Sequence, residues 1–450
     1  MGSTYIVCCI VVAIALLVFL TVKVKLHPFF ALTASAIAFG LLIGQNINDI
    51  MSAYAEGLGG TISGIGVVIA IGTVMGALME KSGGAETMAN AILRLTGKKH
   101  AALGLAITGY FVSIPVFCDS AFVLLSPLAK RMSRDTKTSM TTMAVALAMG
   151  LHATHMLVPP TPGPLSVAGI LGADLGMVIL LGMVVSIPVV AVALVAGRFL
   201  GEKYAFLPEE LADEPEGAEQ RRGPGSLEAF LPILVPIALM LLRTFASLES
   251  APFGDGFVYN LFYSLGNTSV ALLIGLIIAF ITYRRVRPED KQVWTFDGEV
   301  GEALKTAGQI VLIVGAGGAF ATVLKLSDLQ AIVTQAFSGV SLGILVPFII
   351  GAIFRTAIGS GTVGMITAAS MLLPLVDVLG FNSPIGLVIA MLACASGGFM
   401  VFHGNDDFFW VVTSTSGMKP EAAYKVFPII SVLQALTSLA CVFILQMIFL

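Results

Sequence analysis

Charged residues are scarce in this sequence: Asp, Glu, Lys and Arg make up only 11% of its 450 residues. A soluble domain carries about 25% charged residues, so this chain cannot cover a water-solvated surface of its size. The formal net charge is −3, and no basic face indicates a nucleic-acid partner. The composition therefore argues against both a soluble protein and a nucleic-acid-binding one.

Cysteine and histidine are also rare, with five of each. The cysteines lie in apolar segments and form neither a disulfide framework nor a cluster with metal-ligand spacing. No pair of potential ligands has a convincing zinc spacing. The glycine-rich run 315–318 lacks the lysine of a phosphate loop, and close helix packing explains it better. We therefore expect no metal and no cofactor.

What the sequence has in abundance is long apolar segments. Hydrophobic residues make up 57% of it, and the mean hydropathy is +0.96. Stretches of about 18 to 20 apolar residues can cross a hydrocarbon core of about 30 Å. Helices satisfy their own backbone in lipid, and the alternation of a β-barrel is not seen. Residues 5–22 lack a basic start and a cleavage site, which indicates a retained helix.

We therefore predict an all-α polytopic protein of the cell membrane, with the lipid bilayer as its surroundings. A short amphipathic helix is expected at 85–97, and a second short amphipathic piece is expected after 324. The predicted apolar helices are 5–22, 28–44, 62–79, 101–114, 121–129, 140–157, 165–172, 176–197, 229–247, 263–282, 303–324, 341–354, 362–374, 384–398, 408–416 and 425–449.

A polar segment divides the chain into two similar halves. Residues 198–228 are rich in charge, Pro and Gly, which is typical of a solvated linker. Several marks recur at an offset of about 245 residues: the LLSPL of Leu124–Leu128 parallels the LLPL of Leu372–Leu375, and Gly172 parallels Gly417. The predicted units are a first repeat at 1–197, a cytoplasmic linker at 198–228 and a second repeat at 229–450.

The distribution of basic residues predicts the orientation. Lys and Arg favour cytoplasmic loops. Nearly all of the 24 basic residues fall on that side if both termini lie outside and if 101–129 and 341–374 are re-entrant hairpins. The two hairpins then enter from opposite sides. We therefore predict two inverted-topology repeats, each with a re-entrant hairpin and a broken transmembrane helix.

Four interruptions of the apolar pattern mark a candidate site. They are the hairpin tips at 114–120 and 355–361 and the helix breaks at 159–164 and 403–407. Irregular backbone at membrane depth is tolerated where protein or a water-filled cavity solvates it. Each break also exposes helix ends, and a helix N-terminus attracts an anion.

Charged side chains lie at these interruptions. Arg355 could pair with Asp119, Asp406 or Asp407 as a structural contact, or it could bind a substrate carboxylate through its bidentate fork. A buried carboxylate can also hold a coupling proton. Among the histidines, His403 lies in a break and is the preferred candidate, whereas His152 and His155 are as readily explained as neutral core residues.

At these motifs the chain resembles the gluconate:proton symporter (GntP) family of the ion transporter superfamily. The resemblance covers nearly the whole chain and rests on Pro115–Pro127 (PVFCDSAFVLLSP), Val158–Asp174 (VPPTPGPLSVAGILGAD), Arg355–Ala369 and the H-x-N-D of His403–Trp410. The chain departs from the family pattern at Thr161, Ile358, Gly361 and Asp407, which puts gluconate itself in question.

The resemblance implies a secondary active transporter that takes up a small organic anion, such as gluconate or a related sugar acid or hydroxy acid, by proton symport. Sodium is the alternative coupling ion, and the superfamily implies a homodimer. The expected proton-coupling residues are Asp119, His403, Asp406 and Asp407. The expected substrate-binding residues are Cys118, Asp119, Ser120, Pro160, Thr161, Gly163, Arg355, Gly359, Ser360, Gly361, Thr362, His403, Asn405 and Asp406.

Two other classes of function compete with this interpretation. An integral membrane enzyme would need a nucleophile and a base that face a cavity. The best candidate pair in the sequence is Ser120 beside Asp119, and no histidine is assigned to it. A passive channel would lack a coupling residue. Concentrative uptake is the property that separates a secondary transporter from both.

Overall fold

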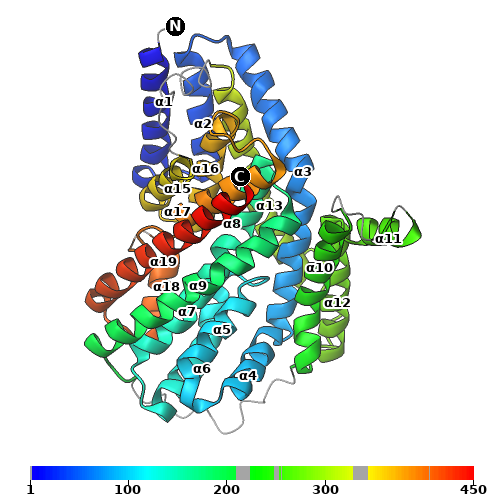
Figure 1. The fold of residues 1–450 in the computed structure, drawn as a ribbon, viewed down its shortest axis with the longest axis vertical. Coiled ribbons are helices and arrows are strands. Elements are labelled where there is room, and N and C mark those ends of the chain that lie inside the picture. The colour runs from blue at the N-terminus through cyan, green and yellow to red at the C-terminus, as the bar shows by residue number, and fades with distance from the viewer. Residues whose placement is uncertain (1–2, 209–222, 248–252, 255, 328–342, 405) are drawn as a thin grey trace.

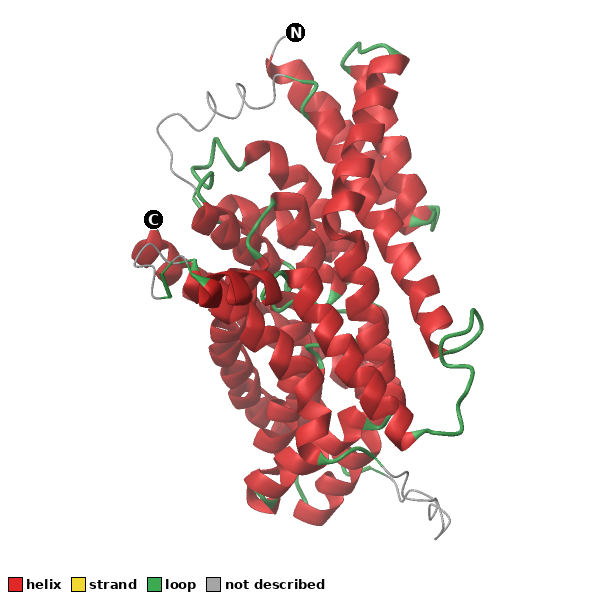
Figure 2. Cartoon of the chain, turned by 90° about the vertical axis from the view of Figure 1, so that its right-hand side faces the viewer, coloured by secondary structure: helices red, strands yellow, loops and turns green. Residues whose placement is uncertain are grey.

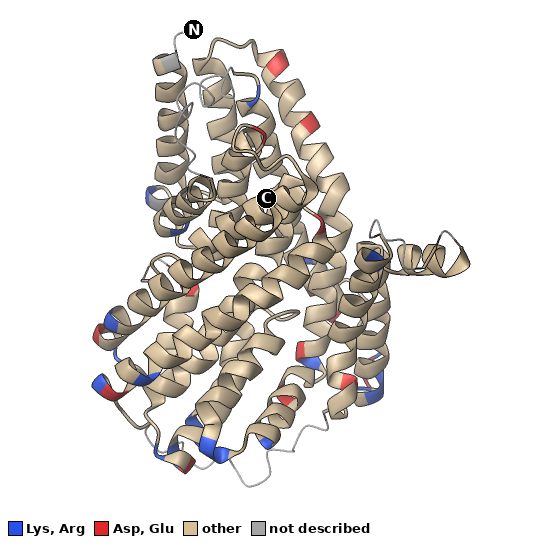
Figure 3. Ribbon diagram, in the orientation of Figure 1, with Lys and Arg blue, Asp and Glu red and all other residues tan. Residues whose placement is uncertain are grey.

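The computed structural model describes residues 3–208, 223–247, 253–254, 256–327, 343–404 and 406–450. All regular structure in these residues is helical (Figure 1). Eight of the described segments are long and apolar enough to cross a membrane. The prediction of an all-α polytopic membrane protein is therefore confirmed. The charged side chains lie mainly at the ends of the helices, and most Lys and Arg follow the left and lower edges of the bundle in Figure 3.

The first half contains nine α-helices in the described residues. The helix predicted at 62–79 begins much earlier, at Ile47, because the Asn46 side chain accepts a hydrogen bond from the Asp49 amide and caps it. The elements are α1 (Ser3–Val18), the π-helix η1 (Phe19–Lys23), α2 (Pro28–Leu42), α3 (Ile47–Lys81), α4 (Gly84–Thr96), the 3₁₀-helix η2 (Lys98–His100), α5 (Ala101–Val112), α6 (Cys118–Thr136), α7 (Met140–Leu157), α8 (Pro162–Leu171) and α9 (Leu175–Lys203).

The second half contains nine α-helices in the described residues. The helix predicted at 263–282 is divided between two helices. The first ends at Leu265 with Gly266 as its C-cap, and Asn267 caps the second by accepting from the Ser269 amide. The short amphipathic piece expected after 324 falls largely outside the described residues. The elements are α10 (Ser226–Ala246), α11 (Phe257–Leu265), α12 (Thr268–Val286), α13 (Glu299–Leu324), α15 (Leu345–Ile358), α16 (Gly361–Leu372), the 3₁₀-helix η3 (Leu373–Leu375), α17 (Pro384–Gly397), α18 (Asp407–Ser416) and α19 (Pro420–Phe449).

The four predicted interruptions separate α5 from α6, α15 from α16, α7 from α8 and α17 from α18. Short loops accordingly lie within the bundle as well as at its ends (Figure 2). The segments after the helix breaks match each other: α8 and α18 have 10 residues each, and both end at a glycine with positive φ, Gly172 (75°) and Gly417 (80°).

Glycine pairs bring corresponding helices together in the two halves. A Cβ on Gly150 of α7 would lie 2.4 Å from the Ala106 carbonyl oxygen of α5. A Cβ on Gly397 of α17 would lie 2.0 Å from the Phe348 carbonyl oxygen of α15. Both distances are shorter than real contacts, so each crossing needs glycine. In both halves, the helix before the first interruption is therefore packed backbone to backbone against the helix before the second interruption.

The halves also exchange contacts. The helix after the first interruption of each half packs on the helix after the second interruption of the other half, so that α6 contacts α18 and α16 contacts α8. The long helices α3 and α13 pack against each other along the middle of the molecule. Helix α7 is buried along its whole length, from Met140 to Leu157, and carries the candidate site on its C-terminal part.

Candidate functional site

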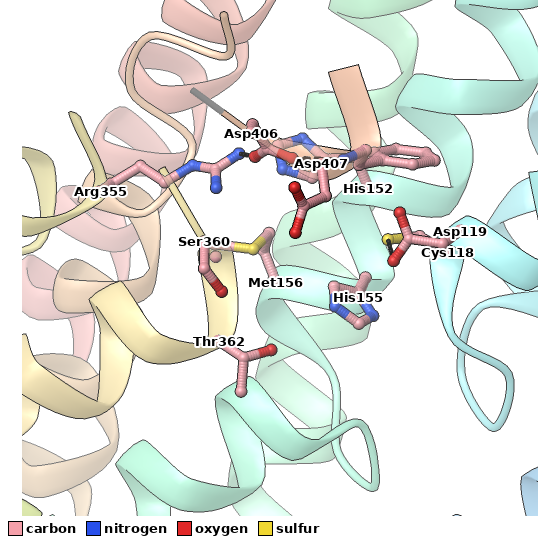
Figure 4. A pocket seen from close by; sticks show the side chains of 12 residues that line it. Cys118, Asp119, His152, His155, Met156, Arg355, Ser360, Thr362, Asp406 and Asp407 are labelled. Carbon is pink, nitrogen blue, oxygen red and sulfur yellow. Dashed lines mark hydrogen bonds and ion pairs between the residues drawn. The ribbon is translucent and has the colours of Figure 1, made fainter. Parts of the chain in front are cut away.

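Three helix N-termini, the buried helix α7 and one residue of α15 surround a cavity of about 90 Å³ (Figure 4). This is smaller than the ~300–1,000 Å³ of a typical ligand pocket, so a larger ligand requires the surrounding helices to move apart. The lining residues are Cys118 and Asp119 of α6, His152, His155 and Met156 of α7, Arg355 of α15, Ser360, Gly361 and Thr362 at the start of α16, and Asp406, Asp407 and Phe408 at the start of α18.

Arg355 is the cation of this cavity, and only 2% of it is exposed. Its guanidinium forms an ion pair with Asp406 and donates to the Gly359 carbonyl oxygen. It also lies 5.8 Å from the centre of the Phe402 ring, within the range of a cation–π contact. Its Nε has no hydrogen-bond partner among the described residues. Of the three aspartates considered from the sequence, Asp406 is thus the structural partner, and one donor of Arg355 stays available.

Asp406 has a second structural role. Its Oδ1 accepts a hydrogen bond of 2.7 Å from the Phe408 amide and so caps α18. Because its other oxygen meets Arg355, this carboxylate already holds both the ion pair and the helix start. Asp407, the next residue, is exposed and lines the same cavity.

Asp119 has few partners of its own. It lies in the first turn of α6, and its Oδ1 is buried without a hydrogen-bond partner in the described part of the chain. Its Oδ2 lies 4.0 Å from the Cys118 sulfur, which is at most a weak contact. A buried carboxylate oxygen without a partner is costly. A proton or a ligand that carries a donor would relieve this cost.

His152 and His155 line the cavity, whereas His403 is half-buried and does not. Both nitrogens of His152 and the Nδ1 of His155 lack hydrogen-bond partners within the described residues. The His152 ring packs edge-on against Phe399 at 5.2 Å. The sequence favours His403 over these two because His403 lies in a break, but the spacing of three residues between His152 and His155 indicates that both lie on one face of α7.

The other predicted site residues surround the cavity without all lining it. Ser360 lines it and caps α16 by accepting from the Val363 amide at 3.4 Å. Pro160 and Thr161 line a neighbouring cavity of about 10 Å³, and Thr161 donates to the Val158 carbonyl oxygen at 2.7 Å.

The remaining predicted residues have other contacts. Gly163 packs against the Met365 methyl. Ser120 interacts with Glu80 of α3, Gly359 contributes its carbonyl to Arg355, and Asn405 lies outside the described residues.

The cavity thus combines attraction for an anion with an excess of carboxylates. The N-termini of α6, α16 and α18 each carry about half a positive charge, and Arg355 adds a full one. Three aspartates face them: Asp119, Asp406 and Asp407. Such a site can bind a carboxylate. It favours a ligand that also carries a positive charge, or one that enters together with a cation.

Comparison with known proteins identifies the family. The profile of the GntP family permeases matches residues 5–448. The chain belongs to the GntP family of permeases. It is 32% identical to a gluconate permease of Pseudomonas aeruginosa, over 98% of this chain and 97% of that one. It is 31% identical to the D-serine transporter DsdX of Escherichia coli O6:H1, over 99% of both chains.

The fold of this GntP permease also occurs in a solved transporter. The crystal structure of the Alcanivorax borkumensis YdaH transporter superposes with a TM-score of 0.62, over 93% of this chain and 97% of that one. The two sequences are only 17% identical, so this likeness concerns the fold alone. The chain is a multi-pass membrane permease, and its family is one of transporters rather than enzymes.

Proposed function

We propose that this permease takes up a small hydroxy acid of the gluconate type by proton symport, with the substrate carboxylate bound in the cavity at Arg355. The main support is the set of five buried side-chain atoms in the cavity lining that lack partners among the described residues. They belong to Asp119, His152, His155 and Arg355. Buried polar groups normally find partners, and a substrate with a carboxylate and hydroxyls supplies them.

Asp119 is the proposed proton carrier. Asp406 is committed to Arg355 and to the cap of α18, so protonating it would break an ion pair. Among the described residues, the Oδ1 of Asp119 has no hydrogen-bond partner that protonation would disrupt. A proton on Asp119 would offset part of the carboxylate excess at the moment when an anionic substrate enters. His155 lies in the same lining and is the proposed partner for proton exchange.

We also propose that the two halves are inverted repeats and that each hairpin is re-entrant. The matched series from α5 to α9 and from α15 to α19, the paired glycine crossings and the exchanged contacts of α6 with α18 and α16 with α8 all support this arrangement. Alternating access would then follow from movement of one half relative to the other.

The clustering of basic residues supports a proposed orientation in the cell membrane. The left and lower edges of the bundle in Figure 3 would face the cytoplasm, with both termini outside. The linker would then be cytoplasmic. The segment between the two flanking helices is shorter than the predicted 198–228, because α9 continues to Lys203 and α10 begins at Ser226. The homodimer stays a prediction.

The excess of carboxylates favours a second class of substrate, a small zwitterion such as D-serine. A zwitterion would place its carboxylate at Arg355 and its ammonium group among Asp119, Asp406 and Asp407. The sequence comparisons do not separate the two classes, because the gluconate and D-serine relatives are 32% and 31% identical. The contribution of the Asp407 carboxylate to binding can separate the two substrate classes, because this carboxylate lines the cavity and is exposed.

The test is uptake of labelled gluconate and D-serine into proteoliposomes, with and without an inward proton gradient. Accumulation of gluconate driven by the proton gradient supports the proposal. Accumulation of D-serine alone supports the zwitterion, and Asp407→Asn should then weaken D-serine uptake more than the control Asp377→Asn, which removes an exposed carboxylate outside the cavity lining. Accumulation that follows sodium and ignores pH would refute the proton mechanism. Equilibration without accumulation in any gradient would refute symport altogether.

A further inference from the structure

A second cavity, of about 460 Å³, lies where α5, α7 and α9 meet, at the end of the bundle that is rich in Lys and Arg (Figure 3). Its charged lining consists of Lys98, Lys99, Lys137, Arg198 and Glu202. We call it the basic cavity. It is separate from the substrate cavity, with which it shares no lining residue.

The basic cavity has an excess of positive charge, because four basic side chains line it and Glu202 is the one acidic residue among its lining residues in the described part of the chain. Lys98 is held by Asp135 at 2.9 Å, but Lys99, Lys137 and Arg198 make no ion pair with a described residue. The N-terminal ends of α5 and α7 border the same space and add partial positive charge. The like charges repel each other, and an anion bound between them would offset this repulsion. The cavity volume is also within the ~300–1,000 Å³ range of small-molecule sites.

Exposed apolar side chains continue from the basic cavity along the helices that form it. Leu103 of α5 is 37% exposed, and Val195 and Phe199 of α9 are 56% and 71% exposed. Arg198 and Phe199 are neighbours in the last turns of a candidate membrane span, Leu175–Lys203. The basic cavity therefore lies where a headgroup would meet the end of the hydrocarbon layer.

We propose that the basic cavity binds the phosphate headgroup of an anionic phospholipid, whose acyl chains lie against Leu103, Val195 and Phe199. The phosphate oxygens would accept from Lys99, Lys137 and Arg198, and the hydroxyls of Thr138 and Ser139 line the same space. The apolar surface beside the cavity is what favours a lipid over a soluble phosphate, which would leave it unused. The proposal does not depend on the transported substrate.

The test measures lipid retention by the purified full chain in detergent, using native mass spectrometry with phosphatidylglycerol and phosphatidylcholine as probes. Each basic residue near an anionic headgroup contributes roughly fivefold, so Lys99→Gln with Lys137→Gln should weaken phosphatidylglycerol binding about thirtyfold. The matched control is Lys23→Gln with Lys25→Gln, two exposed lysines after α1 that do not line the cavity. The charge-keeping pair Lys99→Arg with Lys137→Arg should retain binding and shows that the positions tolerate substitution.

Three results would overturn the proposal. The first is equal retention of phosphatidylglycerol and phosphatidylcholine by the wild-type chain. The second is an equal loss of phosphatidylglycerol in the cavity variant and the control, which would reflect net charge rather than a site. The third is displacement of phosphatidylglycerol by glycerol phosphate or inorganic phosphate at the same concentration as the lipid, which would assign the cavity to a soluble anion.

Discussion

Replacing Asp119 with Asn separates proton coupling from substrate binding. Asn has nearly the same size as Asp and cannot take up a proton. Among the residues that the structure describes, Asp119 has no ion-pair partner and its Oδ1 accepts no hydrogen bond, so the change should cost little stability. Asp406→Asn is the matched contrast. It keeps a good cap for α18 but leaves Arg355 without its counter-charge, which costs about 3–5 kcal/mol.

The magnitude of the effect on transport follows from the gradient. One pH unit corresponds to 1.36 kcal/mol per proton. For one proton per anion and no membrane potential, the wild-type chain should therefore accumulate substrate about tenfold. Asp119→Asn should bring the inside concentration only to the outside one. It should still exchange labelled substrate for unlabelled substrate, because exchange does not require release of the proton.

The assay measures gradient-driven uptake and counterflow in the same proteoliposomes, with the membrane potential clamped to zero. A thermal unfolding curve of each variant supplies the stability change. The reasoning is refuted if Asp119→Asn still accumulates substrate tenfold. It is also refuted if Asp406→Asn is as stable as the wild type and alone loses accumulation, because the coupling proton would then belong to Asp406.

Three further predictions address the anion contact, the orientation and the glycine crossings. Arg355→Lys keeps only one of the two polar contacts, so stability should fall by about 1.5–3 kcal/mol and the Kd for substrate should rise by at least about tenfold; an unchanged Kd would make Arg355 a structural residue only. Cysteines at the exposed positions Leu207 and Phe257, on a cysteine-free background, should react with an impermeant reagent from opposite sides, and labelling of both from outside would contradict the inverted topology. Gly150→Val should destabilise the chain by about 1–3 kcal/mol more than Gly308→Val, measured by thermal unfolding, because a Cβ at Gly308 meets nothing within 4 Å; equal losses would mean that the crossing adapts.

The sequence predicted the fold features that depend on local chemistry. Apolar length marked the spanning helices, and Pro and Gly marked the four interruptions. The cost of charge in a membrane singled out Asp119, Arg355 and Asp406, and all three line one cavity. These predictions succeeded because each depends on a property of one segment, which a single sequence contains.

Features that depend on packing between segments could not be predicted in the same way. Helix α7 is apolar on every side, so no periodicity shows which face His152 and His155 present to a cavity. His403 lies in a break as predicted, but its position in the chain did not give the direction of its side chain. The choice of Asp406 as the partner of Arg355 also required the tertiary structure, because three aspartates were equivalent in the sequence.

The exchanged contacts between the halves have a consequence for the order in which the protein can mature. Helices α6 and α8 are synthesised before α16 and α18, the helices they pack against. The cavity takes lining residues from α6 and α7 and from α15, α16 and α18, so a nascent chain that has inserted only its first half holds an incomplete site. Until α18 has left the ribosome, His152 and Asp119 lack their final surroundings. Under the proposed function, binding of substrate in this cavity would therefore report that synthesis has passed α18, and it would be a property that the permease acquires late in its biosynthesis.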